Sequence, residues 1–184
     1  MIETGLARRI RLLGLDVDGV LTDNGIFLGP VDGQVVELKR FDIQDGLGQV
    51  LMRSAGLPVV WVSGRYSEAT TARARELRVE EVLQVPGAKK VEAFGALLER
   101  RGIAWEEAAF VGDDLADLQV LRRVGLPIAV ANAVAEVKAV ASYVTRAPGG
   151  HGAVREVAEA LLKARGTWPD ILQRYFTERA HGAV

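Results

Sequence analysis

The sequence predicts an α/β fold, a doubly wound parallel sheet with a β-hairpin inserted after its first strand and no cap domain. Short apolar runs alternate with segments of helical period, the pattern of parallel strands covered by helices on both faces. Polar residues follow directly after several of these runs, where ligands bind in doubly wound sheets. At 184 residues, of which 49% are hydrophobic, the chain suits one domain over residues 1–184 better than two.

Each expected strand is a short apolar run bounded by polar or turn-forming residues. The expected strands are 10–15, 58–62, 81–85, 108–111 and 127–130, with a short one near Tyr143. Helices are expected between the strands, in segments with helical periodicity that begin after an N-cap residue or end before a glycine. They cover 47–55 before Gly56, 68–77 after the N-cap candidate Ser67, and 91–101 before Gly102.

One segment breaks this alternation. Residues 25–41 contain two β-prone runs around Pro30-Val31-Asp32-Gly33, which predicts an inserted hairpin. It could be an ordinary edge hairpin, but an apolar projecting hairpin is also a natural surface for self-association, and we favour an oligomer. The tail, about 166–184, is too polar and irregular to assign, although its aromatic residues indicate that it docks on the body.

Composition narrows the function classes. The chain has 23 Lys and Arg against 24 Asp and Glu, so its net charge of −1 offers no electrostatic footprint for nucleic acid. It has no Cys, which excludes disulfides, thiolate metal sites and cysteine nucleophiles and suits a reducing compartment. Asp16 and Asp18 interrupt the apolar run that begins at Ile10, so we expect a soluble cytoplasmic protein without a membrane segment.

The polar residues that follow the apolar runs should meet in one crevice, because the carboxyl ends of parallel strands share one edge of the sheet. They are carboxylates, one hydroxyl and lysine ammonium groups. In chain order they are Asp16-Val17-Asp18-Gly19, Ser63-Gly64-Arg65, Lys89-Lys90, and Gly112-Asp113-Asp114 with Asp117 beyond.

Carboxylates held this close repel one another unless a cation lies between them, and oxygen ligands without His or Cys favour Mg²⁺. We expect Asp16, Asp18 and Asp113 to form the metal site. The Ser63 hydroxyl and a lysine would hold a phosphoryl group. Residues 16 and 18 point the same way at a strand end, so we assign Asp16 as the nucleophile on phosphorus and Asp18 as the general acid and then the base.

The motifs Asp-Val-Asp-Gly-Val-Leu-Thr, Ser-Gly-Arg, Lys and Gly-Asp-Asp-x-x-Asp, in this order, resemble those of the haloacid dehalogenase superfamily from Leu12 to about Leu162. The hairpin, the Asp45-Gly46-Leu47-Gly48 sequence and the run 143–156 look like the branch of 3-deoxy-D-manno-octulosonate 8-phosphate phosphatases. The stretches 23–63 and 63–89 are already filled by the expected elements. They leave no room for the cap domain that other branches insert there.

This resemblance implies a magnesium-dependent phosphatase of lipopolysaccharide biosynthesis that forms an aspartyl-phosphate intermediate on a sugar-acid phosphate. It also implies a homotetramer built through the hairpins, in which a neighbouring subunit covers each open site. Arginines would suit a carboxylated sugar. The implied catalytic residues are Asp16, Asp18, Ser63 and Lys90, and the implied substrate-binding residues are Asp45, Gly46, Gly64, Arg65, Arg73 and Lys89.

Several alternatives stay open at this point. Gln44, Val50 and His151 stand where the family often has basic groups, so another sugar phosphate such as a nonulosonate 9-phosphate is the alternative substrate. Either Lys89 or Lys90 could bind the phosphate, and the spacing to Ala93-Phe94 favours Lys90. A catalytically idle assembly module is the second reading. A receiver-type signalling domain fits less well: its phosphorylated Asp follows a middle strand, whereas here Ser63 and Asp113 follow the later strands of the chain, and the hairpin would be unusual there.

Overall fold

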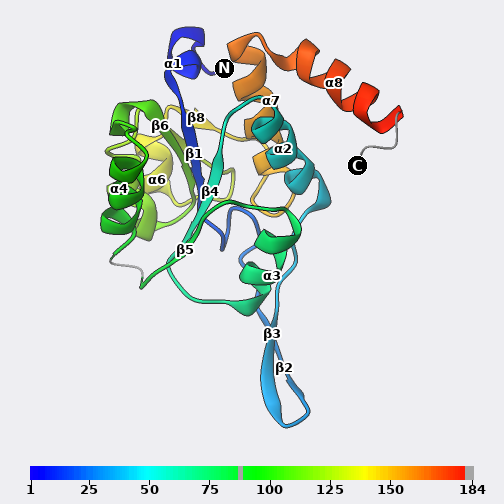
Figure 1. Ribbon diagram of the computed structural model, residues 1–184. Coiled ribbons are helices and arrows are strands. Elements are labelled where there is room, and N and C mark those ends of the chain that lie inside the picture. The colour runs from blue at the N-terminus through cyan, green and yellow to red at the C-terminus, as the bar shows by residue number, and fades with distance from the viewer. Residues whose placement is uncertain (87–88, 181–184) are drawn as a thin grey trace.

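The computed structural model, which describes residues 1–86 and 89–180, has a six-stranded parallel sheet in the order β5-β4-β1-β6-β7-β8 (Figure 1). The α/β prediction is confirmed. Each strand found here lies within or next to a run expected from the sequence. The strands are β1 Leu12–Leu15, β4 Val59–Ser63, β5 Val82–Gln84, β6 Ala108–Gly112, β7 Leu126–Ala129 and β8 Tyr143–Val144.

The first strand lies at the centre because it is apolar on both faces. All residues of β1 are buried, and it pairs in parallel with β4 on one side and β6 on the other. Gly14 is required within it: a Cβ there would lie 2.5 Å from the ring of Phe110, on the neighbouring strand. Because β1 is central and buried on both faces, Asp16, the next residue, lies in the middle of the row formed by the carboxyl ends of the strands.

Helices cover both faces of the sheet (Figure 1). On one face lie α4 Lys90–Arg100, α5 Leu118–Leu121 and α6 Ala135–Val140. On the other lie α2 Ile43–Ser54 and α7 Ala153–Arg165, with α1 Thr4–Arg9 packed against α7. The remaining α3 Glu68–Glu76 follows β4 and contacts the hairpin strand β3, and short 3-10 turns at Trp105–Glu107 and Leu115–Asp117 flank β6.

The expected helix boundaries are largely those observed. Ser67 caps α3 by accepting a hydrogen bond from the Thr70 amide at 3.3 Å, as predicted. Helix α2 begins earlier than expected, at Ile43, because the carboxylate of Asp42 accepts a hydrogen bond from the Gln44 amide at 2.7 Å. An Asp N-cap thus extends the helix over a stretch that sequence periodicity leaves unassigned.

The inserted hairpin, named here as β2 Phe27–Val31, β3 Gln34–Leu38 and their turn, projects from the body (Figure 1). Its strands are antiparallel. The turn is shorter than predicted: Pro30 and Val31 belong to β2, and only Asp32 and Gly33 connect the strands. Both have positive φ, 50° and 78°, the backbone that tight two-residue hairpin turns use.

The tail folds as a helix, α8 Trp168–Ala180, which packs against α7. Ile171 is buried in the core, and the Trp168 ring lies under the Lys163 ammonium at 5.2 Å. The expectation that the aromatic tail docks is therefore confirmed for its first turns, whereas residues 181–184 lie outside the described part of the chain. Among the described residues, every helix is too short or too polar to cross a membrane.

Candidate active site

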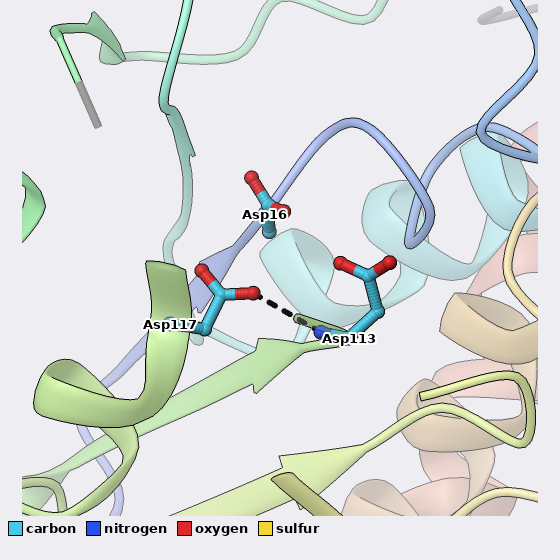
Figure 2. A group of neighbouring side chains, drawn as sticks. All are labelled: Asp16, Asp113 and Asp117. Atoms are coloured by element: carbon cyan, nitrogen blue, oxygen red, sulfur yellow. Dashed lines mark hydrogen bonds between the residues drawn. The ribbon is translucent and has the colours of Figure 1, made fainter. Parts of the chain in front are cut away.

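Three carboxylates meet beyond the carboxyl ends of the central strands. Asp16 follows β1, Asp113 follows β6, and Asp117 comes from the 3-10 turn after Asp113. Figure 2 shows these side chains around a common space, and each can offer a ligand atom within 4.8 Å of the others. The convergence expected from the sequence is thus observed for Asp16 and Asp113. Asp117 joins them, although its place in the Gly-Asp-Asp-x-x-Asp motif was its only signal.

Two glycines allow this close approach. Gly19 has a φ of 88°, and a Cβ on it would lie 1.9 Å from Oδ2 of Asp113. A Cβ on Gly112 would lie 2.6 Å from the side chain of Asp117. Larger residues at either position would displace a carboxylate of the cluster, so these glycines serve the site and not the chain turn alone.

Lys90 connects two of the three carboxylates. Its ammonium donates to Oδ1 of Asp16 at 2.7 Å and to Oδ1 of Asp117 at 2.8 Å, and its side chain is buried. The other oxygen of Asp117 accepts a hydrogen bond from the Asp113 amide at 3.0 Å (Figure 2). The neighbouring Lys89 is exposed. The structure thus places Lys90, the favoured candidate of the pair, at the cluster.

The charges of this cluster do not balance. Burial raises the pKa of Asp16 well above its usual range, and the Asp117 carboxylate raises it further against the opposing effect of Lys90. Burial and Asp117 also raise the pKa of Asp113 to about 7. Burial would lower the pKa of Lys90, but Asp16 and Asp117 outweigh it and raise that pKa. One ammonium therefore faces three carboxylates, a surplus of negative charge that a metal cation would neutralise.

One buried oxygen supports the same conclusion. Among the described residues, Oδ1 of Asp113 is buried without a hydrogen-bond partner. A buried carboxylate oxygen left unpaired is costly unless another group binds it. Together with the surplus charge, this open oxygen suits a hard divalent cation with oxygen ligands.

Asp18 stands apart from the three-carboxylate cluster. Its Oδ1 accepts from the Lys39 ammonium at 2.6 Å, and its Oδ2 accepts from Nε of Arg65 at 3.1 Å. Both carboxylate oxygens therefore have partners on the side of the hairpin. The expected metal contact of Asp18 therefore stays a prediction, because its carboxylate is engaged by these two cations.

Ser63 and Arg65 are held by a tight turn after β4. The Ser63 hydroxyl donates to the carbonyl of Arg65 at 2.9 Å and accepts from the Arg65 amide at 3.3 Å. The guanidinium of Arg65 reaches Glu37 of the hairpin at 2.6 Å as well as Asp18. Gly64 between them is half-buried. The turn thus brings Ser63 to the same strand edge as Asp16, while Arg65 lies partly exposed at its rim.

Asp45 has a structural partner that the sequence did not indicate. Its carboxylate accepts hydrogen bonds from the amides of Gly152 at 3.2 Å and Arg155 at 2.8 Å, at the start of α7. Burial raises the pKa of Asp45 to about 6 against these hydrogen bonds. Arg73 lies beside Gly46 and pairs with Glu76 at 2.7 Å. Asp45 therefore joins α2 to α7, and its expected contact with a substrate stays a prediction.

The late run 143–156 supports the loop that carries Asp16. The Gly150 amide donates to the carbonyl of Val20 at 3.0 Å, and a Cβ on Gly149 would lie 1.8 Å from the carbonyl oxygen of Gly19. Asn132, which sequence reasoning missed, donates to Gly19 and accepts from the Gly149 amide at 2.6 Å. The glycine pair is therefore needed for close packing against the turn after β1.

Comparison with known proteins places this geometry in a family. A profile of haloacid dehalogenase-like hydrolases matches residues 81–157. The 3-deoxy-D-manno-octulosonate 8-phosphate phosphatase of Escherichia coli K12 is 44% identical over 160 residues, which cover 87% of this chain and 83% of the relative.

Solved structures agree with the sequence match. The phosphatase of that name from Moraxella catarrhalis, in complex with magnesium ion, phosphate ion and KDO, has a TM-score of 0.87 and 35% identity, covering 94% of this chain and 97% of its own. The cobalt-bound Haemophilus influenzae deoxy-D-mannose-octulosonate 8-phosphate phosphatase has a TM-score of 0.80 and 32% identity, covering 88% and 92%. The chain belongs to the family of 3-deoxy-D-manno-octulosonate 8-phosphate phosphatases within the haloacid dehalogenase-like hydrolases.

Proposed function

We propose that the protein is a magnesium-dependent phosphatase that hydrolyses 3-deoxy-D-manno-octulosonate 8-phosphate through a phosphorylated Asp16. The observation that carries the proposal is the cluster of Asp16, Asp113 and Asp117 at the strand ends, bridged by the buried Lys90. Relatives that are named for this activity, including the 44% identical Escherichia coli protein, support the substrate.

Asp16 is the nucleophile in this mechanism. Its carboxylate attacks phosphorus, a bond forms between aspartate oxygen and phosphorus, and the bond from phosphorus to the sugar oxygen breaks. Asp18 gives a proton to the departing sugar oxygen. In the second half, Asp18 takes a proton from water, the water oxygen attacks phosphorus, and the bond from phosphorus to the Asp16 oxygen breaks to release inorganic phosphate. Lys90 and the Ser63 hydroxyl would donate hydrogen bonds to the phosphoryl oxygens.

Asp16 and Asp113 are the carboxylates proposed to hold Mg²⁺, with the backbone carbonyl of residue 18. Bound Mg²⁺ would neutralise the crowded carboxylates and the phosphoryl charge. The unpaired Oδ1 of Asp113 and the raised pKa of Asp16 support this assignment. Asp117 instead fixes Lys90 and the Asp113 amide, so we propose that it orients the site. The related Moraxella catarrhalis structure is described with a magnesium ion.

Substrate recognition is assigned to the rim of the crevice. The partial exposure of Arg65 supports its proposed contact with a sugar carboxylate, and Gly64 and Lys89 are proposed as further contacts. Asp45, Gly46 and Arg73 remain proposed contributors. Because Gln44 and Val50 replace expected basic groups, a nonulosonate 9-phosphate is the alternative substrate that an assay must separate.

We also propose that residues 1–184 act as one domain and assemble as a homotetramer through the hairpins. Two strands alone are marginally stable in water, and this hairpin exposes large apolar side chains on both faces. Those with more than half of their surface exposed are Phe27, Leu28, Val31, Val35 and Leu38. A neighbouring subunit would bury them and cover the open site. The absence of Cys is compatible with the cytoplasm, which we propose as the location.

The test is phosphate release with Mg²⁺ over a panel of phosphate esters: the octulosonate 8-phosphate, a nonulosonate 9-phosphate, hexose 6-phosphates and an aryl phosphate. A preference of about a hundredfold for the octulosonate, equal to about 2.7 kcal/mol, is expected. Equal rates over the panel would contradict the substrate assignment. Failure of the wild-type protein to release phosphate from any ester would favour the idle assembly module.

A further inference from the structure

Two charged residues at the base of the hairpin turn inward, unlike the exposed apolar residues of the same hairpin. Lys39 follows β3 directly, and its side chain is fully buried. Glu37, within β3, has a side chain that is 21% exposed. A fully buried ammonium is rare unless it is paired, so its partners indicate why it is there.

The partners of Lys39 lie in the proposed active site. Its ammonium donates to Oδ1 of Asp18 at 2.6 Å and to the Thr70 hydroxyl of α3 at 3.3 Å, and Oε1 of Glu37 lies 3.7 Å away. The ammonium thus makes two hydrogen bonds and one longer ion-pair contact, since 3.7 Å exceeds hydrogen-bond distance. Lys39 is therefore buried between Asp18 and α3, with Glu37 of the hairpin nearby.

A second connection runs from the hairpin to the other oxygen of Asp18. Glu37 accepts from Nη2 of Arg65 at 2.6 Å and from the hydroxyl of Ser67, the N-cap of α3, at 2.5 Å. Arg65 in turn donates to Oδ2 of Asp18 at 3.1 Å. The carboxylate of Asp18 is thus held at one oxygen by Lys39 directly and at the other by an arginine that the hairpin anchors.

We propose that Lys39 is a positioning residue for Asp18, and that the hairpin therefore orients the proton-transferring group of the reaction as well as forming an assembly surface. This inference rests on the proposed function. Proton transfer demands that the carboxylate lie within hydrogen-bond reach of the departing sugar oxygen and of the hydrolytic water. An Asp side chain that loses one of its two anchors rotates more freely, and small misplacements of catalytic groups cost about a hundredfold in rate.

The test compares two substrates whose leaving groups differ in their need for a proton. An aryl phosphate such as 4-nitrophenyl phosphate loses a stable phenolate, so its first step does not need an acid, whereas a sugar alkoxide needs one. In Lys39→Met, kcat/KM for the octulosonate 8-phosphate should fall by about tenfold to a hundredfold, while kcat/KM for 4-nitrophenyl phosphate stays within about threefold. A burst of nitrophenolate followed by slow turnover is also expected, because Asp18 then acts as the base.

Controls separate this role from a general loss of structure. Lys138→Met removes an exposed lysine of α6 and should leave both substrates unaffected. Lys39→Arg, which keeps a cation, should recover part of the sugar-phosphate activity. If Lys39→Met disturbs the assembly seen by light scattering, Thr70→Val removes one anchor of Lys39 from the α3 side and should give a smaller effect in the same direction.

The outcomes are distinguishable. Equal losses on both substrates in Lys39→Met, or no loss on the sugar phosphate, would overturn the positioning role while leaving the phosphatase intact. A wild-type protein that is inactive on both esters would overturn the proposed function, and this inference with it. Unequal losses without recovery in Lys39→Arg would also contradict an orienting cation at this position.

Discussion

The carboxylate cluster and the hairpin differ in how much of each is buried within a single chain. At the strand ends, Lys90 pairs with both Asp16 and Asp117 inside a buried site. In the hairpin, by contrast, Leu28 and Val35 have 68% and 76% of their surface exposed. The difference indicates that one chain assembles the carboxylate cluster by itself, and it is consistent with the proposed burial of the hairpin by a second subunit. The base of the hairpin contacts the proposed site through Glu37 and Lys39.

The largest effect is expected where the buried charges depend on one another. Lys90→Met leaves the Asp16 and Asp117 carboxylates buried without their ammonium partner. Breaking such a buried pair costs about 3–5 kcal/mol of folding free energy, and activity should fall by about a hundredfold or more. Urea unfolding with and without Mg²⁺ measures the loss, which the cation should reduce.

The neighbouring Lys89→Met is the matched control for this variant. Lys89 is exposed, so its unfolding free energy should change by less than about 0.5 kcal/mol. If activity falls in Lys89→Met and not in Lys90→Met, the assignment of the phosphate contact to Lys90 is wrong.

Substitutions in the hairpin should have the opposite effect: they should weaken the proposed assembly and leave the fold of the body unchanged. The double variant Leu28→Ser, Val35→Ser removes two apolar side chains from the same face, since Leu28 pairs with Glu37 and Val35 with Pro30. We expect a smaller oligomer by light scattering, with the fold of the body intact by circular dichroism. Val144→Ser, an exposed apolar residue of β8, is the control. An unchanged molar mass in the double variant would contradict assembly through the hairpin.

A smaller effect concerns the pH dependence of the metal-free protein. The pKa of Asp113 is raised by burial from 3.8 to about 7, so the folded state holds its proton more tightly than the unfolded chain. Ionisation of Asp113 then favours unfolding, and its contribution to stability is lost as pH rises from about 4 to about 7.

Thermal unfolding in EDTA checks this sign. Stability should decline across that pH range and decline less in Asp113→Asn, whose residue does not ionise. With excess Mg²⁺ the decline should shrink, because the cation binds the ionised carboxylates. A metal-free protein whose stability rises steadily from pH 5 to about 7, with no difference in Asp113→Asn, would show that this carboxyl is not buried as described.

The smallest effect is expected at Asp45, which joins α2 to α7. Asp45→Asn weakens the hydrogen bonds to the amides at the start of α7 and should cost about 1–2 kcal/mol of stability. If its role is structural alone, KM for the sugar phosphate should not change. A KM increase of tenfold or more without loss of stability would instead support the predicted substrate contact.

Sequence reasoning predicts well where the local pattern alone decides the structure. The apolar run before Asp16 indicates a central strand, and the order of polar residues after the strands predicts which side chains meet. It failed where a long-range contact decides. Asn132 supports the Gly19 turn from a distant loop, and Asp45 reaches α7. The early start of α2 was missed for a local reason, because the N-cap Asp42 stands only two residues before Gln44 but outside the apolar period. None of these contacts leaves a periodic signal.

The inward turn of Lys39 was missed for a related reason. In the sequence it is one charge in the run Glu37-Leu38-Lys39-Arg40, which resembles an exposed strand end. Only the placement of Asp18 and Thr70 from other elements makes it a buried ammonium. The burial of a charged residue in an inserted segment therefore cannot be predicted from that segment alone, because it depends on residues of other elements.

The most direct test of the account is to identify the phosphorylated residue. The wild-type protein is mixed with the octulosonate 8-phosphate and Mg²⁺, quenched in acid within the first turnover, digested and examined by mass spectrometry, with Asp16→Asn as the control. The account predicts phosphate on the peptide that contains Asp16, and neither phosphopeptide nor turnover in Asp16→Asn. Phosphate on another residue, or undiminished turnover in Asp16→Asn, would contradict it.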